Sequence, residues 1–135
     1  MTSSGGAAPL GLTVLGATFA IHRFAPDAAL PDAVRTAVPV WIARTPEELS
    51  IVCAEAVGLA APRRIGGWRC LQVAGPLPLD LVGVLAGLST VLAEAGVCVL
   101  ALSTHDTDFL LVPGKDLERG VAALRGAGYG IAAPT

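Results

Sequence analysis

The sequence predicts an α+β fold in which helices cover one face of an antiparallel sheet. Short runs rich in β-branched and large apolar residues recur along the chain, as is typical of strands. Two longer segments, residues 81–95 and 115–127, instead place apolar residues at helical spacing. From residue 68 onward the elements follow the order strand, helix, strand, strand, helix, strand. This is the ferredoxin-like βαββαβ order.

The first half of the chain supplies strands and loops but no long helix. Strands are predicted at residues 12–24, 40–45 and 48–55. Residues 26–37 are predicted to be a loop with at most one helical turn, and residues 58–67 a loop or a short helix. We therefore interpret this half as a shortened copy of the βαββαβ unit, lying side by side with the complete unit of the second half.

The helix at residues 81–95 is bounded by residues that favour a start and a stop. Its apolar face comprises Leu81, Val84, Leu85, Leu88, Val91, Leu92 and Ala95. Asp80 is predicted to be the N-cap, and Gly96 follows the last apolar position as a left-handed stop. Gly83 and Gly87, one turn apart, leave a strip without side chains along which a strand, a helix or a small ligand can approach the backbone.

The last predicted helix ends at Gly128, and residues 129–133 add a short final strand. The domain organisation follows from these elements. We expect residues 1–8 to be disordered, because they are small and polar. Residues 9–66 form the N-terminal unit and residues 67–135 the C-terminal unit.

A hairpin with two carboxylates follows the first helix. Residues 97–103 and 108–112 are apolar runs separated by turn-forming residues. If Asp106 and Asp108 lie in extended chain, their side chains point to the same face. The nearby helix N-terminus presents N–H groups that suit a carboxylate, whereas the aspartates suit a cation. A free amino acid carries both charges, so the pattern predicts amino-acid binding.

The composition limits the classes of partner. Apolar residues make up 53% of the chain and charged residues only 15%, which predicts an exposed apolar patch and a homodimer. A net charge of −2 without a basic cluster argues against nucleic-acid binding. No apolar run reaches the ~18 to 20 residues that span a bilayer, and no basic segment precedes residues 7–21, so we expect neither a membrane span nor a signal peptide.

The cysteines and serines show no catalytic or metal-binding pattern. Cys53, Cys70 and Cys98 are odd in number and lack CxxC spacing, so we expect buried free thiols in a reducing cytoplasm rather than disulfides or a zinc site. Ser50 and Ser103 lack the sequence context of a catalytic serine, and no phosphate-loop motif is present. We therefore expect no enzymatic activity and no cofactor.

Three segments of the chain resemble the small tandem ACT-domain proteins, a family that includes the cytosolic arginine sensors of animals. These segments are ELSIV (residues 48–52), GPLPLDLVGVLAGLS (residues 75–89) and LSTHDTDFLLV (residues 102–112). ELSIV also resembles the ligand-binding strand in the regulatory ACT domains of aspartate kinases. The resemblance implies two ACT-like units side by side, an amino-acid ligand between them and dimers that extend the sheet. It implies a regulatory ligand sensor and does not imply catalysis.

The resemblance also implies roles for individual residues. Ser50 and Ile51 would offer a hydroxyl and strand backbone to the ligand. The residues that would surround its α-carboxylate and α-amino group are Asp80, Gly83, Val84 and Leu85. The residues that would face its side chain are Thr104, His105 and Asp108. Where the arginine sensors have a second acid, this chain has Leu81, so a smaller or less basic amino acid fits the resemblance as well as arginine does.

Each of these features has a simpler interpretation. Asp80 acts as an N-cap in any helical protein, and Asp106 and Asp108 are ordinary hairpin-turn residues. His105 with the two aspartates is a candidate metal site, although no matching ligand is apparent elsewhere in the sequence. A second class of function also stays open: a structural or subunit-like ACT protein that acts through contacts with a regulated protein partner.

Overall fold

The computed structural model describes residues 10–78 and 80–133. The strands are β1 (Gly11–Phe24), β2 (Val40–Arg44), β3 (Leu49–Ala54), β4 (Arg63–Val73), β5 (Leu100–Ser103), β6 (Asp108–Pro113) and β7 (Gly130–Ala132). The helices are α1 (Val84–Glu94), α2 (Leu117–Gly126) and the short 3-10 helices η2 (Asp32–Arg35), η3 (Glu55–Val57) and η4 (Gly114–Asp116). Residues 1–8, for which we predicted disorder, lie outside the described residues. None of the helices in the described part of the chain is long and apolar enough to cross a membrane.

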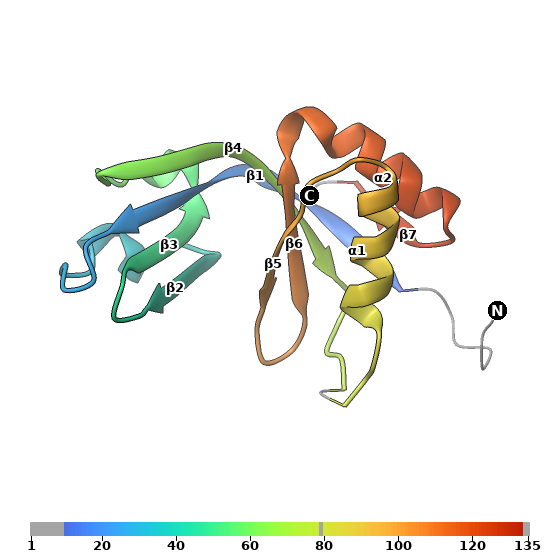
Figure 1. Ribbon diagram of the computed structural model, residues 1–135, viewed down its shortest axis with the longest axis horizontal. Helices are drawn as coiled ribbons and strands as arrows, with labels where there is room; N and C mark the ends of the chain where they lie inside the picture. The colour runs from blue at the N-terminus through green and yellow to red at the C-terminus, as the bar shows by residue number, and fades with distance from the viewer. Residues whose placement is uncertain (1–9, 79, 134–135) are drawn as a thin grey trace.

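The strands form one sheet in the order β2-β3-β1-β4-β6-β5. All neighbours along this path are antiparallel, whereas β7 pairs with β1 in parallel. β1 is long enough to serve both halves of the sheet: residues 11–13 pair with β7, and residues 19–24 pair with β3. Figure 1 shows β1 and β4 running from one half of the molecule into the other. The predicted unit boundary at residues 66 and 67 falls inside β4, so the two units share strands, and this division stays a prediction.

α1 and α2 lie together against one face of the C-terminal half of the sheet (Figure 1). Leu88 and Leu92 of α1 and Leu124 of α2 are fully buried there. These leucines pack on side chains of β1, β4 and β6, in the cluster that forms the main core. The predicted α+β, ferredoxin-like fold with helices on one face is confirmed.

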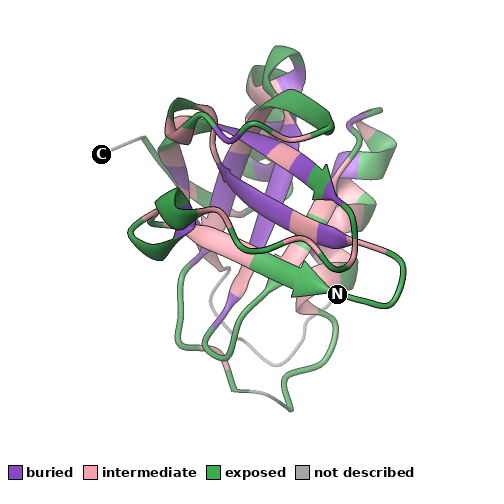
Figure 2. Cartoon of the chain, turned by 90° about the vertical axis from the view of Figure 1, so that its left-hand side faces the viewer, coloured by how far each residue is buried: buried purple, intermediate pink, exposed green. Residues whose placement is uncertain are grey.

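The N-terminal half of the sheet has its own buried face. Phe24, Leu49, Ile51 and Cys53 form a cluster that Val34 of η2 covers. The helices of this half in the described residues are the short η2 and η3, as expected for a shortened unit. Buried residues concentrate along the strands, whereas many loop residues are exposed (Figure 2).

A third cluster lies on the sheet face opposite the helices. Phe19, Phe109 and Trp41 pack edge to face there, with ring centroids 6.0 Å apart for Phe19 and Trp41 and 5.0 Å apart for Trp41 and Phe109. Trp41 belongs to β2 and Phe109 to β6, so the two ends of the sheet curl toward each other on this side.

Several predicted boundaries were wrong. β4 begins at Arg63 rather than at residue 68, because Arg63 and Arg64 pair with β1. α1 begins at Val84 rather than at residue 81, and its N-cap position is Gly83 instead of Asp80. Gly96 adopts the predicted left-handed conformation after the helix, with φ of 74°.

Two expectations about side chains also need correction. Cys53 and Cys70 are buried as expected, but Cys98 is exposed. The glycine strip on α1 is open only at Gly83, because a Cβ on Gly87 would meet the hydroxyl of Tyr129 at 2.9 Å. Tyr129 therefore occupies the second half of the strip.

Candidate functional site

A small pocket lies between the loop that precedes α1 and the turn of the β5–β6 hairpin. Its volume is about 110 Å³. The lining residues are Leu77, Pro78, Leu81, Val84, Thr104, His105, Asp106, Thr107 and Asp108. We call this site the loop–hairpin pocket.

Direct hydrogen bonds fix the two walls of the pocket together. The Leu77 N–H donates to the Asp106 carbonyl at 2.7 Å. The hydroxyl of Thr107, which is buried, donates to the Val73 carbonyl at 2.7 Å. Gly75 allows this close approach, since a Cβ there would lie 3.0 Å from the Asp106 carbonyl oxygen. The two walls of the pocket are therefore held in fixed positions by the fold.

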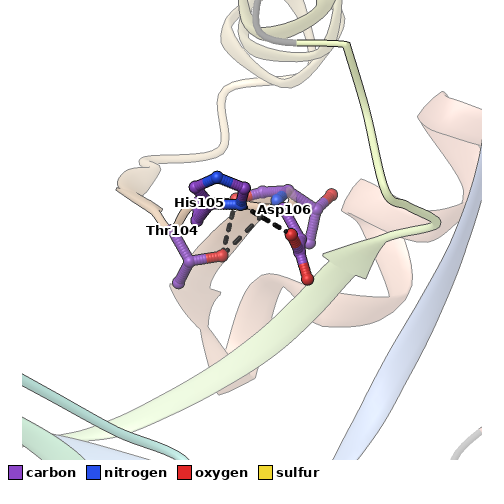
Figure 3. Close-up of polar contacts among 4 residues, drawn as sticks. Thr104, His105 and Asp106 are labelled. Atoms are coloured by element: carbon purple, nitrogen blue, oxygen red, sulfur yellow. Dashed lines mark hydrogen bonds and ion pairs between the residues drawn. The ribbon is translucent and has the colours of Figure 1, made fainter.

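The hairpin turn holds its own shape with local hydrogen bonds (Figure 3). The Thr104 N–H donates to the Thr107 carbonyl at 2.9 Å, and the Thr104 hydroxyl donates to the same carbonyl at 3.2 Å. His105 Nδ1 lies 2.9 Å from Asp106 Oδ1. The side chains of His105 and Asp106 are 89% and 71% exposed, so they form the solvent-facing rim of the pocket.

Asp108 is the half-buried carboxylate of the pocket. Its Oδ1 accepts a hydrogen bond of 2.7 Å from the Ser103 hydroxyl. No other side-chain partner of Asp108 is found in the described part of the chain. One carboxylate oxygen is thereby positioned and the other is available for a ligand.

The N-terminus of α1 lies at the pocket without a side-chain cap. Gly83 occupies the N-cap position with φ of 87°, and no side chain of the described residues bonds to the first turn. The first helical hydrogen bond runs from the Gly87 N–H to the Gly83 carbonyl at 2.9 Å. The N–H groups of the preceding turn, which begins at the pocket residue Val84, therefore remain unpaired within the helix. They give this end of the pocket a partial positive charge.

The chain resembles known proteins in both sequence and overall fold. Residues 64–126 match the family model of the ACT domain. The protein Atu0741 from Agrobacterium tumefaciens is 31% identical and superposes with a TM-score of 0.87 over 96% of each chain. The chain is an ACT-domain protein. No curated protein matches its sequence.

More distant structures share the fold of this ACT-domain protein. VC0802 from Vibrio cholerae, described as a possible transport protein, is 18% identical with a TM-score of 0.67, over 88% of this chain and 90% of that one. The regulatory subunit of aspartate kinase from Thermus thermophilus is 12% identical with a TM-score of 0.62. That match covers 90% of the ACT-domain protein and 99% of the subunit.

Four of the nine predicted site residues line the loop–hairpin pocket: Val84, Thr104, His105 and Asp108. Asp80 and Gly83 lie in the loop before α1, and both are exposed outside the pocket lining. Leu85 is half-buried and packs against the helix-side core. Residues of both walls of the pocket were thus predicted from the sequence, whereas the N-cap of α1 was not.

The structure places Ser50 and Ile51 away from the pocket. Ser50 lines a second site, whereas the Ile51 side chain is fully buried in the N-terminal core. The Ile51 carbonyl is paired with Nδ1 of His22 at 3.0 Å. Neighbouring residues of a strand point to opposite faces, so the two side chains do not face the same space.

Four further lining residues were not assigned to the ligand from the sequence. They are the apolar residues Leu77, Pro78 and Leu81, and the polar residue Thr107. The proline-rich stretch before α1 was a signal for an ordered loop, because prolines restrict the chain. The contact between that loop and the hairpin turn had no local signal.

The second site is a groove between the two ends of the sheet. It has a volume of about 360 Å³ and is formed by β2, β3 and β5. Its lining residues are Val40, Trp41, Ile42, Ala43, Ser50, Val52, Leu102 and Ser103. We call it the end-strand groove.

Metal binding and thiol chemistry gain no support from the described residues. Among them, no group of three or more His, Cys, Asp or Glu side chains is arranged to hold a metal ion. Burial raises the pKa of the Cys70 thiol to about 12 and also raises the pKa of Cys53. Both thiols therefore stay protonated near neutral pH, and a protonated thiol is a poor nucleophile.

Proposed function

We propose that this ACT-domain protein is a regulatory protein that binds a free amino acid in the loop–hairpin pocket and catalyses no reaction. The observation that carries the proposal is the pairing of an uncapped helix N-terminus with a carboxylate in one pocket. The first turn of α1 begins at Val84, and Asp108 lies on the hairpin side. A partial positive charge and a carboxylate in one small site complement a zwitterion.

The two ends of the ligand follow from this polarity. The α-carboxylate accepts hydrogen bonds from the first-turn N–H groups near Val84 and Leu85. Asp108 accepts from an amino group or from a polar side chain, and the Thr104 hydroxyl adds a further polar contact. The apolar wall formed by Leu77 and Leu81 favours an amino acid whose side chain is partly aliphatic.

The pocket of about 110 Å³ is smaller than the ~300 Å³ and more of typical ligand sites, so an amino acid projects from it. Leu81 lines the pocket and is 48% exposed, and the neighbouring residue Val82 is 92% exposed. In our proposal a second copy of the chain covers these two exposed apolar side chains, and the protein is a homodimer. Ser50 then faces the ligand from the second copy, with the ligand held between ACT-like units. Ile51 takes no part, because its side chain is buried and its carbonyl is paired with His22.

The organisation we propose is that of the tandem ACT proteins: two units, residues 9–66 and 67–135, acting together in the cytoplasm. The match to the aspartate kinase regulatory subunit over nearly its whole length supports a regulatory role. A regulated protein partner is part of this proposal. The second candidate, a subunit-like protein without a ligand, draws support from exposed apolar side chains such as Val38 and Ile65, which are 89% and 61% exposed.

A thermal-shift screen against the twenty amino acids separates the two candidates. Ligand at about 100 times its Kd should stabilise the protein by about 2.7 kcal/mol. The amino acid with the largest shift is then titrated calorimetrically to obtain the Kd and the stoichiometry per chain. If none of the twenty raises the melting temperature, the amino-acid proposal fails and the subunit-like candidate takes its place.

A further inference from the structure

The end-strand groove has a defined floor that follows from strand register. Trp41 pairs with Val52 and Ala43 pairs with Ser50 across β2 and β3, and paired residues point to the same face. These four side chains form the floor. The opposite wall is Leu102 of β5, which belongs to the same cluster, together with Ser103.

The chemistry of the lining is apolar and uncharged. Among the residues that the structure describes, no Asp, Glu, Lys, Arg or His lines the groove, and one side of it is aromatic. The Trp41 ring is held in place by edge contacts with Phe19 and Phe109, so it offers a preorganised surface to a planar group. With about 360 Å³, the groove falls within the ~300 to 1,000 Å³ range of small-molecule sites.

One hydroxyl supplies the polar contact. The Ser50 hydroxyl has no hydrogen-bond partner among residues 10–78 and 80–133, and it can accept or donate. Ser103 lies at the end of the groove, but its hydroxyl is on the other face of β5, where it donates to Asp108. The groove thus offers one polar contact on an otherwise apolar surface.

We propose that the end-strand groove binds a small uncharged molecule with a planar apolar body and an N–H or O–H group. A small molecule fits better than an extended peptide. On the β5 side only Leu102 and Ser103 line the groove, and two residues of strand span about 7 Å. The floor also consists of side chains, whereas an added strand would need a continuous backbone edge. The residues that line this site are different from those that line the loop–hairpin pocket.

The test uses indole, which is uncharged, planar and carries one N–H donor. The protein has two tryptophans, Trp41 in the groove and Trp68 outside it, and each gives one side-chain N–H signal in a nitrogen-15 correlation spectrum. Titration of the labelled full chain with indole to millimolar concentration should shift the Trp41 signal in a saturable manner and leave the Trp68 signal in place. Indole-3-acetate should bind more weakly, because no cation lines the groove to balance its carboxylate.

Two matched variants locate the binding. Ala43→Leu adds a side chain on the groove face at an exposed position, and it should raise the Kd for indole by about tenfold or more, equivalent to about 1.4 kcal/mol. Ala101→Leu adds the same atoms at an exposed position of β5 that pairs with Leu110, on the other face, and it should leave the Kd unchanged. Absence of a saturable Trp41 shift, equal shifts of both tryptophans, or undiminished binding by a folded Ala43→Leu protein would each overturn the proposal.

Discussion

The Ser103 hydroxyl donates a hydrogen bond of 2.7 Å to Asp108 Oδ1 across the β5–β6 hairpin. The two residues are directly opposite in the strand register. Ser103 lines the end-strand groove and Asp108 lines the loop–hairpin pocket, so this one bond stands between two separate cavities. A ligand group that binds Asp108 shares this carboxylate with Ser103, which is bonded to one of its two oxygens.

Asp108→Ala should weaken binding of a polar or basic amino acid by about ten- to a hundredfold. The physical reason is the loss of a charge-assisted hydrogen bond worth about 1.5 to 3 kcal/mol. Folding should change little, because Ser103 is exposed and water can replace its partner. Calorimetric titration measures the Kd, and thermal unfolding checks the stability.

Asp32→Ala is the matched control for that variant. The Asp32 side chain is 94% exposed and lies in η2, in a different part of the fold from the pocket. Its removal should leave the Kd for the amino acid unchanged. Wild-type affinity in Asp108→Ala would show that the ligand's side chain does not reach this carboxylate.

Gly83→Ala should destabilise the protein by about 1 to 2 kcal/mol, because Gly83 has φ of 87° and a Cβ is strained in the left-handed region. There is open space around the position, so the cost comes from the backbone and not from a clash. Gly126→Ala, in helical conformation with equally open surroundings, should instead stabilise by about 0.5 to 1 kcal/mol. Urea unfolding of both variants measures the difference, and equal effects would refute the role of the backbone angle.

Thr107→Val should cost about 1 to 3 kcal/mol of stability, because it leaves the Val73 carbonyl without the donor that now lies at 2.7 Å. Thr107→Ser keeps the hydroxyl and should cost much less. The loss of that bond should also loosen the hairpin turn, so Thr107→Val is expected to weaken amino-acid binding more than Thr107→Ser does. Denaturant unfolding and calorimetric titration of both variants distinguish the effect of losing the hydroxyl from the effect of changing the side-chain volume.

Stability should fall above about pH 9 through the Cys70 thiol. Burial raises the pKa of Cys70 from its ordinary value of 9.0 to about 12, so the folded state keeps a proton that the unfolded chain releases. Between these two values the free energy of unfolding should decrease by about 1.4 kcal/mol per pH unit from this group. Below about pH 9 the thiol is protonated in both the folded and the unfolded state, so the stability is not reduced by this group.

Urea unfolding at about pH 8 and about pH 10 tests this pH dependence. The difference in the free energy of unfolding between the two conditions reports the proton that the unfolded chain releases. Cys70→Ala should lose less stability between the two conditions than the wild type. Cys98→Ala should behave as the wild type does, because Cys98 is exposed. An identical loss in the wild type and Cys70→Ala would assign the alkaline destabilisation to other groups.

The sequence alone determined the elements that depend on local pattern. The apolar spacing of residues 115–127 predicted α2, and the left-handed stop at Gly96 followed from the end of the apolar face. The hairpin of β5 and β6 was predicted from turn residues between two apolar runs. These features need only neighbours within a few positions, so their signals lie in short segments.

The site was predicted in part for the same reason. Thr104, His105 and Asp108 lie in the pocket because a hairpin turn gathers consecutive residues. Asp80 was misassigned because a helix start depends on the backbone angle at Gly83 as well as on residue type. Ser50 was assigned to the same ligand by resemblance, and within one chain it faces a different cavity.

The tertiary structure decided how the two halves are joined. Whether Arg63 and Arg64 extend β4 depends on pairing with β1, whose partner residues are about forty positions earlier in the sequence. The meeting of Trp41 with Phe109, which creates the end-strand groove, depends on the curl of the whole sheet. Sheet curvature is the sum of twists over many strand pairs, and no local segment of the sequence encodes that sum.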